Sequence, residues 1–405
     1  MPAYRAFDEY TIKDYLMELG TIFDENAQLS SREIGDGNLN LVFHVQDTVS
    51  GKSVIVKQSL PYARVVGESM PLTITRNEME ARALEQQQTY CPEHTVKLLK
   101  HDRDLQLFVM EDLSDHIIMR KGLIAKNEYP HFAEHISSFM ANTLFHTSDL
   151  YMDQLEKKEL VKEFINPELC KITEDLVFTQ PYYDAPENNI PEEIREEAEK
   201  IWQDTELQAE VAQLKYQFMT KAEALLHGDL HTGSIFVTET STKVIDPEFV
   251  YVGPMGFDIG ALLANLLLNY AAQEGWSETE EERREVRNRL LTMIEETWTK
   301  FEVKFRALME QKTQDPMFSN TSFQVSFMKN VFADSLGYAG AKMIRRIYGL
   351  AHVADIDQIG DVSKRKQAQT LSLRIGRELI VARKRFNSIE EVRQFVEKQT
   401  AALTI

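Results

Sequence analysis

Two acidic segments joined by a short β-like hairpin constrain this chain more than any other feature. The first segment is His227-Gly228-Asp229-Leu230-His231-Thr232-Gly233-Ser234, and the second is Asp246-Pro247-Glu248. Between them, residues 234–237 and 243–245 are apolar β-like runs. A hairpin brings its two ends side by side, so Asp229 and Asp246 are expected to face one site. Phosphoryl transfer needs such a pair, because one carboxylate orients the attacking hydroxyl while others hold Mg²⁺ against the phosphates.

Two features nearer the N-terminus are consistent with a bound nucleotide. The run Gly35-Asp36-Gly37-Asn38-Leu39-Asn40 precedes a β-rich segment, and its glycines would let backbone N–H groups approach a phosphate. Lys57 ends the β-like run 54–57, where it could reach the phosphates of that nucleotide. Each feature has a structural alternative. The glycines could form a plain hairpin turn, and the lysine could protect an edge strand from aggregation.

The helix predicted over residues 75–88 offers a carboxylate partner for Lys57. Glu78 and Glu80 both lie on it, but they point to nearly opposite sides. Glu80 falls on the apolar face, where an unpaired charge is costly, whereas Glu78 falls on the polar face. Glu80 is therefore the expected partner, and Glu78 is expected to be solvated.

Composition excludes several classes of protein. The 405 residues include 45 Lys+Arg and 64 Asp+Glu, and a net charge of −19 disfavours binding to nucleic acid. Cys91 and Cys170 are too few for a disulfide framework and form no zinc motif, so reduced thiols in the cytoplasm are expected. The N-terminal residues lack a signal-peptide core. The most apolar stretch, residues 257–272, is interrupted by polar residues and predicts a buried helix rather than a membrane span.

The pattern along the chain predicts an α+β protein of two lobes. Residues 1–113 indicate a small β-sheet with one inserted helix, preceded by a helix that Thr11 would cap. Residues 114–405 are mostly helical, apart from the hairpin and a loop expected at the surface over 180–191. The predicted helices of this second lobe cover residues 132–145, 192–223, 257–272, 280–311, 323–346 and 368–385.

The order of these motifs resembles the protein-kinase-like fold in its aminoglycoside phosphotransferase and choline kinase branch. The finer resemblance is to the bacterial 5-methylthioribose kinase family, of the Bacillus type. It covers essentially the whole chain. It rests on the run from Gly35 to Asn40, Val109-Met110-Glu111-Asp112-Leu113, the run from His227 to Ser234, Asp246-Pro247-Glu248, Gly253-Pro254-Met255-Gly256-Phe257-Asp258-Ile259-Gly260, and Lys342-Met343-Ile344-Arg345-Arg346.

The resemblance implies roles for further residues. Glu111, Asp112 and Leu113 would bind adenine as the linker between the lobes, mainly through backbone groups. Asp246 and Glu248 would hold Mg²⁺, with Pro247 bending the chain between them. Ser234 stands where most kinases carry an Asn that binds the second metal, and the resemblance implies Ser234 as a metal ligand, with Glu248 as an additional hard oxygen ligand. Arg345 and Arg346 would grip the sugar hydroxyls. His227 would brace the loop, as would Asp258.

The expected function is therefore transfer of the ATP γ-phosphate to the anomeric hydroxyl of 5-methylthioribose. Asp229 would orient that hydroxyl and accept its proton late, with a carboxylate of normal pKa. Two alternatives stay open. One is a kinase of the same fold for another alcohol, such as an aminoglycoside, choline, homoserine or a fructosamine. The other is a nucleotide-binding module without catalysis. The sequence does not fix the oligomeric state, and a homodimer is one option.

Overall fold

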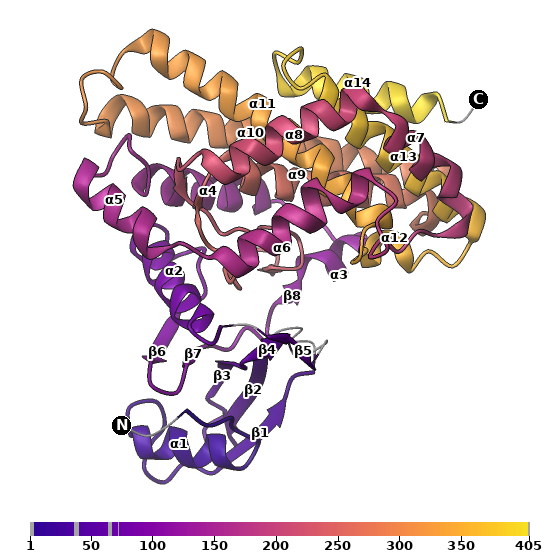
Figure 1. Cartoon of the computed structure of the whole chain (residues 1–405). Coiled ribbons are helices and arrows are strands. Elements are labelled where there is room, and N and C mark those ends of the chain that lie inside the picture. Colours follow the sequence, from indigo (N-terminus) through magenta and orange to yellow (C-terminus); the bar gives the residue numbers. More distant parts are fainter. Residues whose placement is uncertain (1–3, 36–39, 64–66, 72, 404–405) are drawn as a thin grey trace.

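The chain folds into a small sheet-containing lobe and a large helical lobe (Figure 1). The computed structural model describes residues 4–35, 40–63, 67–71 and 73–403. The α+β architecture predicted from the sequence is confirmed. In the described part of the chain, no helix combines the length and the apolar character that a membrane crossing requires.

The small lobe is built on a five-stranded antiparallel sheet with the order β1-β2-β3-β7-β6. Its strands are β1 (Leu29–Glu33), β2 (Asn40–Asp47), β3 (Ser53–Ser59), β6 (Leu98–Asp102) and β7 (Leu107–Glu111), and β4 (Tyr62–Ala63) pairs with β5 (Gly67–Pro71). Helix α1 (Thr11–Leu19) packs its apolar residues on one face of the sheet. Helix α2 (Arg76–Tyr90) contacts the other face, because alternate residues of a strand point to opposite sides.

The prediction that Thr11 caps the first helix is wrong. Helix α1 begins at Thr11 itself, and Tyr10 occupies the capping position without a side-chain hydrogen bond. Instead, Oδ1 of Asp8 accepts hydrogen bonds from the backbone N–H and the hydroxyl of Thr11, both at 2.8 Å. A carboxylate three residues before the expected cap therefore fixes this helix start.

A small sheet of the large lobe lies at the junction with the small lobe. Strand β8 (Ile117–Ile118) pairs with β10 (Ile235–Val237), which forms the predicted hairpin with β11 (Thr242–Val244). The backbone of Val244 also bridges to Thr95 of the small lobe. Since β8 already belongs to the sheet of the large lobe, we propose that the lobes divide at Leu113, as 1–113 and 114–405.

The large lobe contains many helices around one core, together with the short β9 (Ala224–Leu225) and β12 (Val252–Gly253). The helices are α3 (Met119–Ile124), α4 (Phe132–His146), α5 (Gln154–Glu163), α6 (Pro167–Phe178), α7 (Arg195–Gln203), α8 (Thr205–Thr220), α9 (Gly256–Trp276), α10 (Glu280–Lys312), α11 (Thr321–Tyr348), α12 (Ala354–Asp357), α13 (Val362–Val381) and α14 (Ile389–Ala401), with 3₁₀ turns at Gln180–Tyr182 and Glu192–Ile194. Five of the predicted helices correspond to α4, α9, α10, α11 and α13.

The single helix predicted over 192–223 is wrong, because the chain breaks at Asp204. Helix α7 ends there. The Asp204 carboxylate then caps α8, because it accepts a hydrogen bond at 2.9 Å from the N–H of Leu207 in the first turn of that helix. The predicted surface loop over 180–191 is partly wrong too. Pro181 and Tyr182 are buried, and the hydroxyl of Tyr348 donates to the carbonyl of Pro181 at 2.7 Å.

Helices α9 and α11 cross closely at the centre of the large lobe. Gly260 of α9 makes this possible, because a Cβ built on it would lie 2.5 Å from the carbonyl oxygen of Ser335 and 2.8 Å from the nitrogen of Ala339. Both neighbours belong to the backbone of α11, so a side chain at this position could be accommodated only by moving a helix.

We predict that Gly260→Ala destabilises the protein by about 1–3 kcal/mol, because overpacking at a helix crossing forces backbone shifts. The control is Gly360→Ala, since a Cβ at Gly360 would meet no atom within 4 Å. Urea unfolding of both variants measures the effect. Equal stability of the two variants would contradict the close crossing.

Candidate active site

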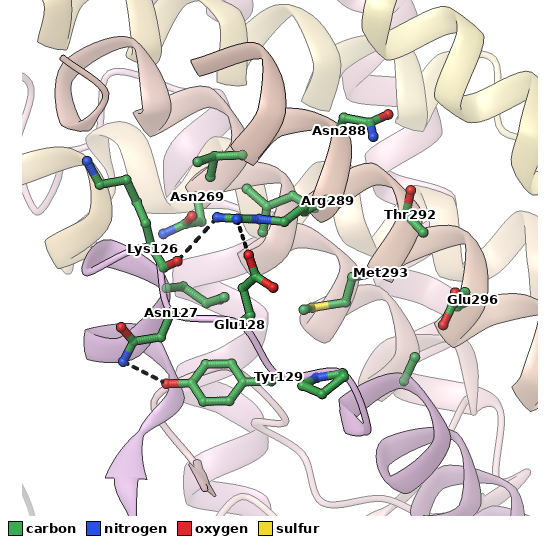
Figure 2. A pocket seen from close by; sticks show the side chains of 15 residues that line it. Lys126, Asn127, Glu128, Tyr129, Asn269, Asn288, Arg289, Thr292, Met293 and Glu296 are labelled. Carbon is green, nitrogen blue, oxygen red and sulfur yellow. Dashed lines mark hydrogen bonds and ion pairs between the residues drawn. The ribbon is translucent and has the colours of Figure 1, made fainter. Parts of the chain in front are cut away.

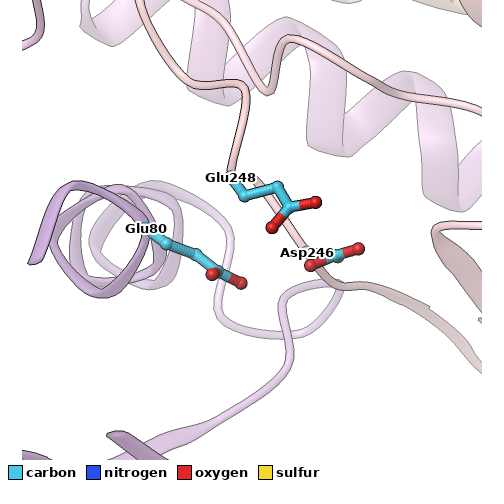
Figure 3. A group of neighbouring side chains, drawn as sticks. All are labelled: Glu80, Asp246 and Glu248. Carbon is cyan, nitrogen blue, oxygen red and sulfur yellow. The ribbon is translucent and has the colours of Figure 1, made fainter. Parts of the chain in front are cut away.

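A buried lysine meets three carboxylates where the lobes face each other. The ammonium nitrogen of Lys57, on β3, lies 2.7 Å from Oε1 of Glu80 on α2 and 3.7 Å from Oε2 of Glu248, and it also contacts the carboxylate of Asp246. Figure 3 shows the three carboxylates turned toward a common point. Their oxygens lie within 4.8 Å of one another. The pairing of Lys57 with Glu80 was predicted from helical periodicity and is confirmed, whereas Glu78 pairs with Arg103 at 3.5 Å.

The electrostatics of this cluster indicate missing positive charge. Burial opposes the charge on Lys57, but Asp246 and Glu80 outweigh burial and raise its pKa. Burial also raises the pKa of Glu80 to about 8, and burial together with Asp246 raises the pKa of Glu248 to about 7. The ammonium of Lys57 and the nearby guanidinium of Arg76 therefore face three crowded carboxylates, which outnumber them. A divalent cation with a preference for hard oxygen ligands would fit this donor set.

The backbone after the hairpin brings both metal-ligand candidates into reach. Asp246 has a φ of 69°, in the left-handed region that few non-glycine residues adopt. This bend and Pro247 let the Asp246 and Glu248 carboxylates reach the same cluster. The side-chain amide of Asn40 donates to Oε2 of Glu248 at 2.9 Å and so holds that carboxylate in place.

A cavity of about 370 Å³ includes the cluster in its lining and is otherwise lined in part by apolar side chains. Its apolar lining includes Val42, Ile55, Met110, Leu113, Phe236 and Ile245 from both lobes. Glu111, Asp112 and Leu113 line one edge. The Asp112 carboxylate is occupied, because it accepts from the hydroxyls of Ser53 and Ser114, both at 2.6 Å, and contacts His44 at 3.0 Å. Its side chain therefore fixes the linker to the sheet.

The predicted phosphate loop is described only at its ends. Gly35 is exposed, and Gly37 and Asn38 lie outside the described residues. Asn40 is buried, and its Oδ1 accepts hydrogen bonds from Ser59 and Arg76.

Asp229 forms a second centre, on the side of the large lobe. Its Oδ1 accepts a hydrogen bond at 3.0 Å from Lys342 of α11, and its Oδ2 lies 3.2 Å from Nε2 of His231. Burial alone would raise the pKa of Asp229, but His231 and Lys342 hold it well below its ordinary value. Burial lowers the pKa of His231 to about 4, so its imidazole is neutral at pH 7. A carboxylate of normal pKa was expected to suffice as base, and the pKa of Asp229 lies below that value.

Asp258 and His227 brace the loop that carries Asp229, as predicted. The Asp258 carboxylate at the start of α9 accepts from the N–H groups of His227 at 2.6 Å and Gly228 at 2.9 Å, and His227 contacts the carbonyl of Ile245 at 2.8 Å. Gly228 has a φ of 83°, and a Cβ there would lie 2.0 Å from a backbone oxygen of Phe249. Loop and hairpin thus touch backbone to backbone.

Ser234, the third metal-ligand candidate, faces its own loop. Its hydroxyl donates to the carbonyl of Asp229 at 3.2 Å and lies 3.2 Å from Nδ1 of His231. It therefore helps to shape the turn that carries Asp229. Its part in metal binding stays a prediction.

The two arginines near the end of α11 contact the segment that follows it. Nη1 of Arg345 donates to the carbonyl of Ala351 at 2.8 Å, and Nη1 of Arg346 donates to the carbonyl of His352 at 3.2 Å. Lys342 lies one turn earlier on the same helix, so these residues share one side of the site. The sequence motif contained Lys342, but no spacing rule indicated that it pairs with Asp229.

Comparison with known proteins agrees with this geometry. The model of a family described as "Phosphotransferase enzyme family" matches residues 30–298. Methylthioribose kinase of Yersinia pseudotuberculosis serotype IB (strain PB1/+) is 44% identical over 100% of this chain and 99% of its own length. Methylthioribose kinase of Geobacillus sp. (strain WCH70) is 45% identical over 99% and 98%. This chain belongs to the methylthioribose kinase family. Among solved structures, a choline kinase from Cryptosporidium parvum Iowa II aligns with a TM-score of 0.45 at 13% identity, over 97% of this chain and 100% of that chain.

We predict that Glu80→Gln lowers kcat/KM for ATP by about 10- to 100-fold, because a buried charge-assisted hydrogen bond to Lys57 is lost. Steady-state kinetics with varied ATP measures this. Glu78→Gln on the same helix is the control and should stay within about twofold, since Glu78 is only partly buried and its partner Arg103 is exposed. Similar losses in both variants would show that the effect belongs to the helix rather than to Lys57.

Proposed function

We propose that this protein transfers the γ-phosphate of ATP to the anomeric hydroxyl of 5-methylthioribose, giving 5-methylthioribose 1-phosphate and ADP in methionine salvage. The acceptor rests on one observation: relatives that match the whole chain at 44–45% identity are methylthioribose kinases. The phosphotransferase chemistry is supported independently by the family match and by the pairing of the Lys57 cluster with Asp229.

In this proposal one side of the cleft binds ATP and the other side binds the acceptor. ATP lies in the apolar cavity, with adenine at the linker of Glu111, Asp112 and Leu113. Its phosphates lie under residues 35–40 and on Lys57, which Glu80 holds in place. Asp246, Pro247 and Glu248 border the same phosphates.

Asp229 orients the sugar hydroxyl toward the γ-phosphorus. Its low pKa makes it a weak base, so it accepts the proton late, once the new P–O bond has made the hydroxyl more acidic. Its hydrogen bond to Lys342 fixes the carboxylate for this purpose. Arg345 and Arg346 bind oxygen atoms of the acceptor.

Asp246 and Glu248 are the residues that would hold Mg²⁺. When bound, the ion would supply charge that neutralises the phosphate oxygens. The cluster fits such an ion because its carboxylates outnumber the Lys57 ammonium. Ser234 remains a candidate for a second metal.

The alternative acceptors and the non-catalytic module fit less well. Choline and aminoglycosides are cationic, and the cations Lys342, Arg345 and Arg346 on one side of Asp229 would repel them. A module without catalysis would not need Asp229. Purified protein with ATP and a panel of these alcohols tests the proposal, and turnover of another alcohol in preference to methylthioribose would overturn it.

We also propose that the protein acts in the cytoplasm, which its two free cysteines support. A homodimer is part of the same proposal, and the mass measured by light scattering tests it.

We predict that Asp229→Asn lowers kcat by about 10²- to 10⁴-fold, the usual range for loss of a general base, while ATP still binds. Single-turnover kinetics and a fluorescent nucleotide titration measure the two effects. Near-normal turnover would place the base elsewhere.

A further prediction concerns the metal. Glu248→Gln should raise the Mg²⁺ concentration needed for half-maximal activity by about tenfold or more, because the substitution removes the negative charge and one of the two oxygen atoms of this ligand. Titration of activity with Mg²⁺ at saturating ATP measures this. Glu111→Gln, which lies in the linker, is the control and should leave the Mg²⁺ requirement unchanged.

A further inference from the structure

Arg120, the second residue of α3, lies beside the catalytic loop although no sequence motif indicated it. Its backbone N–H donates to the carbonyl of Thr232 at 3.0 Å. A Cβ built on Gly233 would lie 2.9 Å from Nη1 of Arg120 and 2.8 Å from the ring of His231. The guanidinium therefore lies next to His231, the residue that contacts Asp229.

The guanidinium is held firmly on its far side. Nη2 donates to Oδ1 of Asn265 on α9 at 3.0 Å, and Nε forms an ion pair at 3.3 Å with the buried carboxylate of Asp355 on α12. Asp355 is itself fixed by a hydrogen bond of 2.7 Å from Asn269. Two helices thus position the group.

One nitrogen of the Arg120 guanidinium, Nη1, remains available to bind a ligand. Nη1 donates to no group within the described residues, and it is not among the buried atoms without a partner. The Arg120 side chain is 18% exposed, and that of Asp229 is 22% exposed. An accessible guanidinium edge beside the catalytic loop is suited to an oxygen anion.

The side chains around Asp229 carry a net positive charge that a neutral sugar would not balance. Four cationic side chains, Arg120, Lys342, Arg345 and Arg346, act on a region with the carboxylates Asp229 and Asp355. Asp258, beneath the loop, is satisfied by backbone N–H groups. Burying uncompensated cations is costly, and a dianionic phosphate would offset that cost.

We propose that Arg120 binds the phosphate of the sugar 1-phosphate product, with Asp355 and Asn265 as its positioning residues. The inference rests on the proposed function, because it takes the product to be a sugar 1-phosphate. It makes Arg120 a specificity residue for the phosphorylated state of the sugar. The product therefore competes with the sugar for this site.

The test compares an anionic and a neutral ligand in one variant. Calorimetric titration of wild type and Arg120→Gln uses ribose 1-phosphate, inorganic phosphate and methylthioribose. Arg120→Gln should weaken binding of ribose 1-phosphate by about 10- to 100-fold, and of inorganic phosphate in the same direction, while affinity for methylthioribose changes less than about threefold. Arg120→Lys keeps the charge but loses the planar fork, so its loss should be about 3- to 10-fold.

The matched control is Arg289→Gln. Arg289 of α10 lines a separate cavity of about 430 Å³, where it pairs with Glu128 and donates to the carbonyl of Lys126 at 3.2 Å (Figure 2). The Arg289→Gln variant loses the same charge at a position away from Asp229, so the affinity of this variant for ribose 1-phosphate should equal that of the wild type. If Arg120→Gln and Arg289→Gln lost the same affinity for ribose 1-phosphate, net charge alone would explain the effect, and the proposal would be overturned.

The outcomes separate this inference from the proposed function. If Arg120→Gln weakens the binding of ribose 1-phosphate and of methylthioribose equally, or weakens neither, the role of Arg120 is overturned. This holds even if the wild type phosphorylates methylthioribose. Selective weakening of the anion supports it even if another sugar proves to be the acceptor. If Arg120→Gln does not fold, Arg120→Lys decides, because unchanged affinity for ribose 1-phosphate in that variant contradicts the proposal.

Discussion

The buried ammonium of Lys57 is the interaction on which the cleft depends. It joins β3 and α2 of the small lobe to the segment after the hairpin of the large lobe, through Glu80, Asp246 and Glu248. Removing Lys57 would leave three crowded carboxylates without this ammonium, which is far more costly than a missing surface ion pair. The cluster therefore sets the distance between the lobes and, with it, the space in which a nucleotide can lie.

A second constraint places Asp229 opposite that cluster. The close crossing of α9 and α11, which Gly260 permits, brings the carboxylate of Asp258 under the catalytic loop and the ammonium of Lys342 onto Asp229. The Asp229 carboxylate is thus positioned by Lys342 of α11 and by His231 of its own loop, and Asp258 of α9 holds the backbone of that loop. Packing far from the cleft is therefore part of the geometry of the site.

The sequence predicted those parts of the structure that depend on local patterns. The hairpin, the helix of Glu80 and the long apolar helix follow from periodicity and turn residues. The break at Asp204 was missed, because one capping aspartate in a polar helical stretch resembles a solvent-exposed residue. Lys342 was quoted within a motif, but its partner was not predicted, because α11 and the catalytic loop are distant in sequence. Arg120 had no signal at all, since its partners Asn265 and Asp355 come from two other helices.

The two sides of the site differ in charge in a way that suits the direction of transfer. On the side proposed to bind the nucleotide, carboxylates outnumber the cations Lys57 and Arg76, so a divalent cation that accompanies the polyphosphate would fit there. On the side proposed to bind the acceptor, cations outnumber carboxylates, and a neutral sugar would bring no charge to balance them. The transferred phosphoryl group would carry negative charge from the first side to the second. Its arrival would offset the repulsion among Lys342, Arg345 and Arg346, so the electrostatics of the protein would favour the phosphorylated sugar over the free one before any contact with the sugar ring is considered.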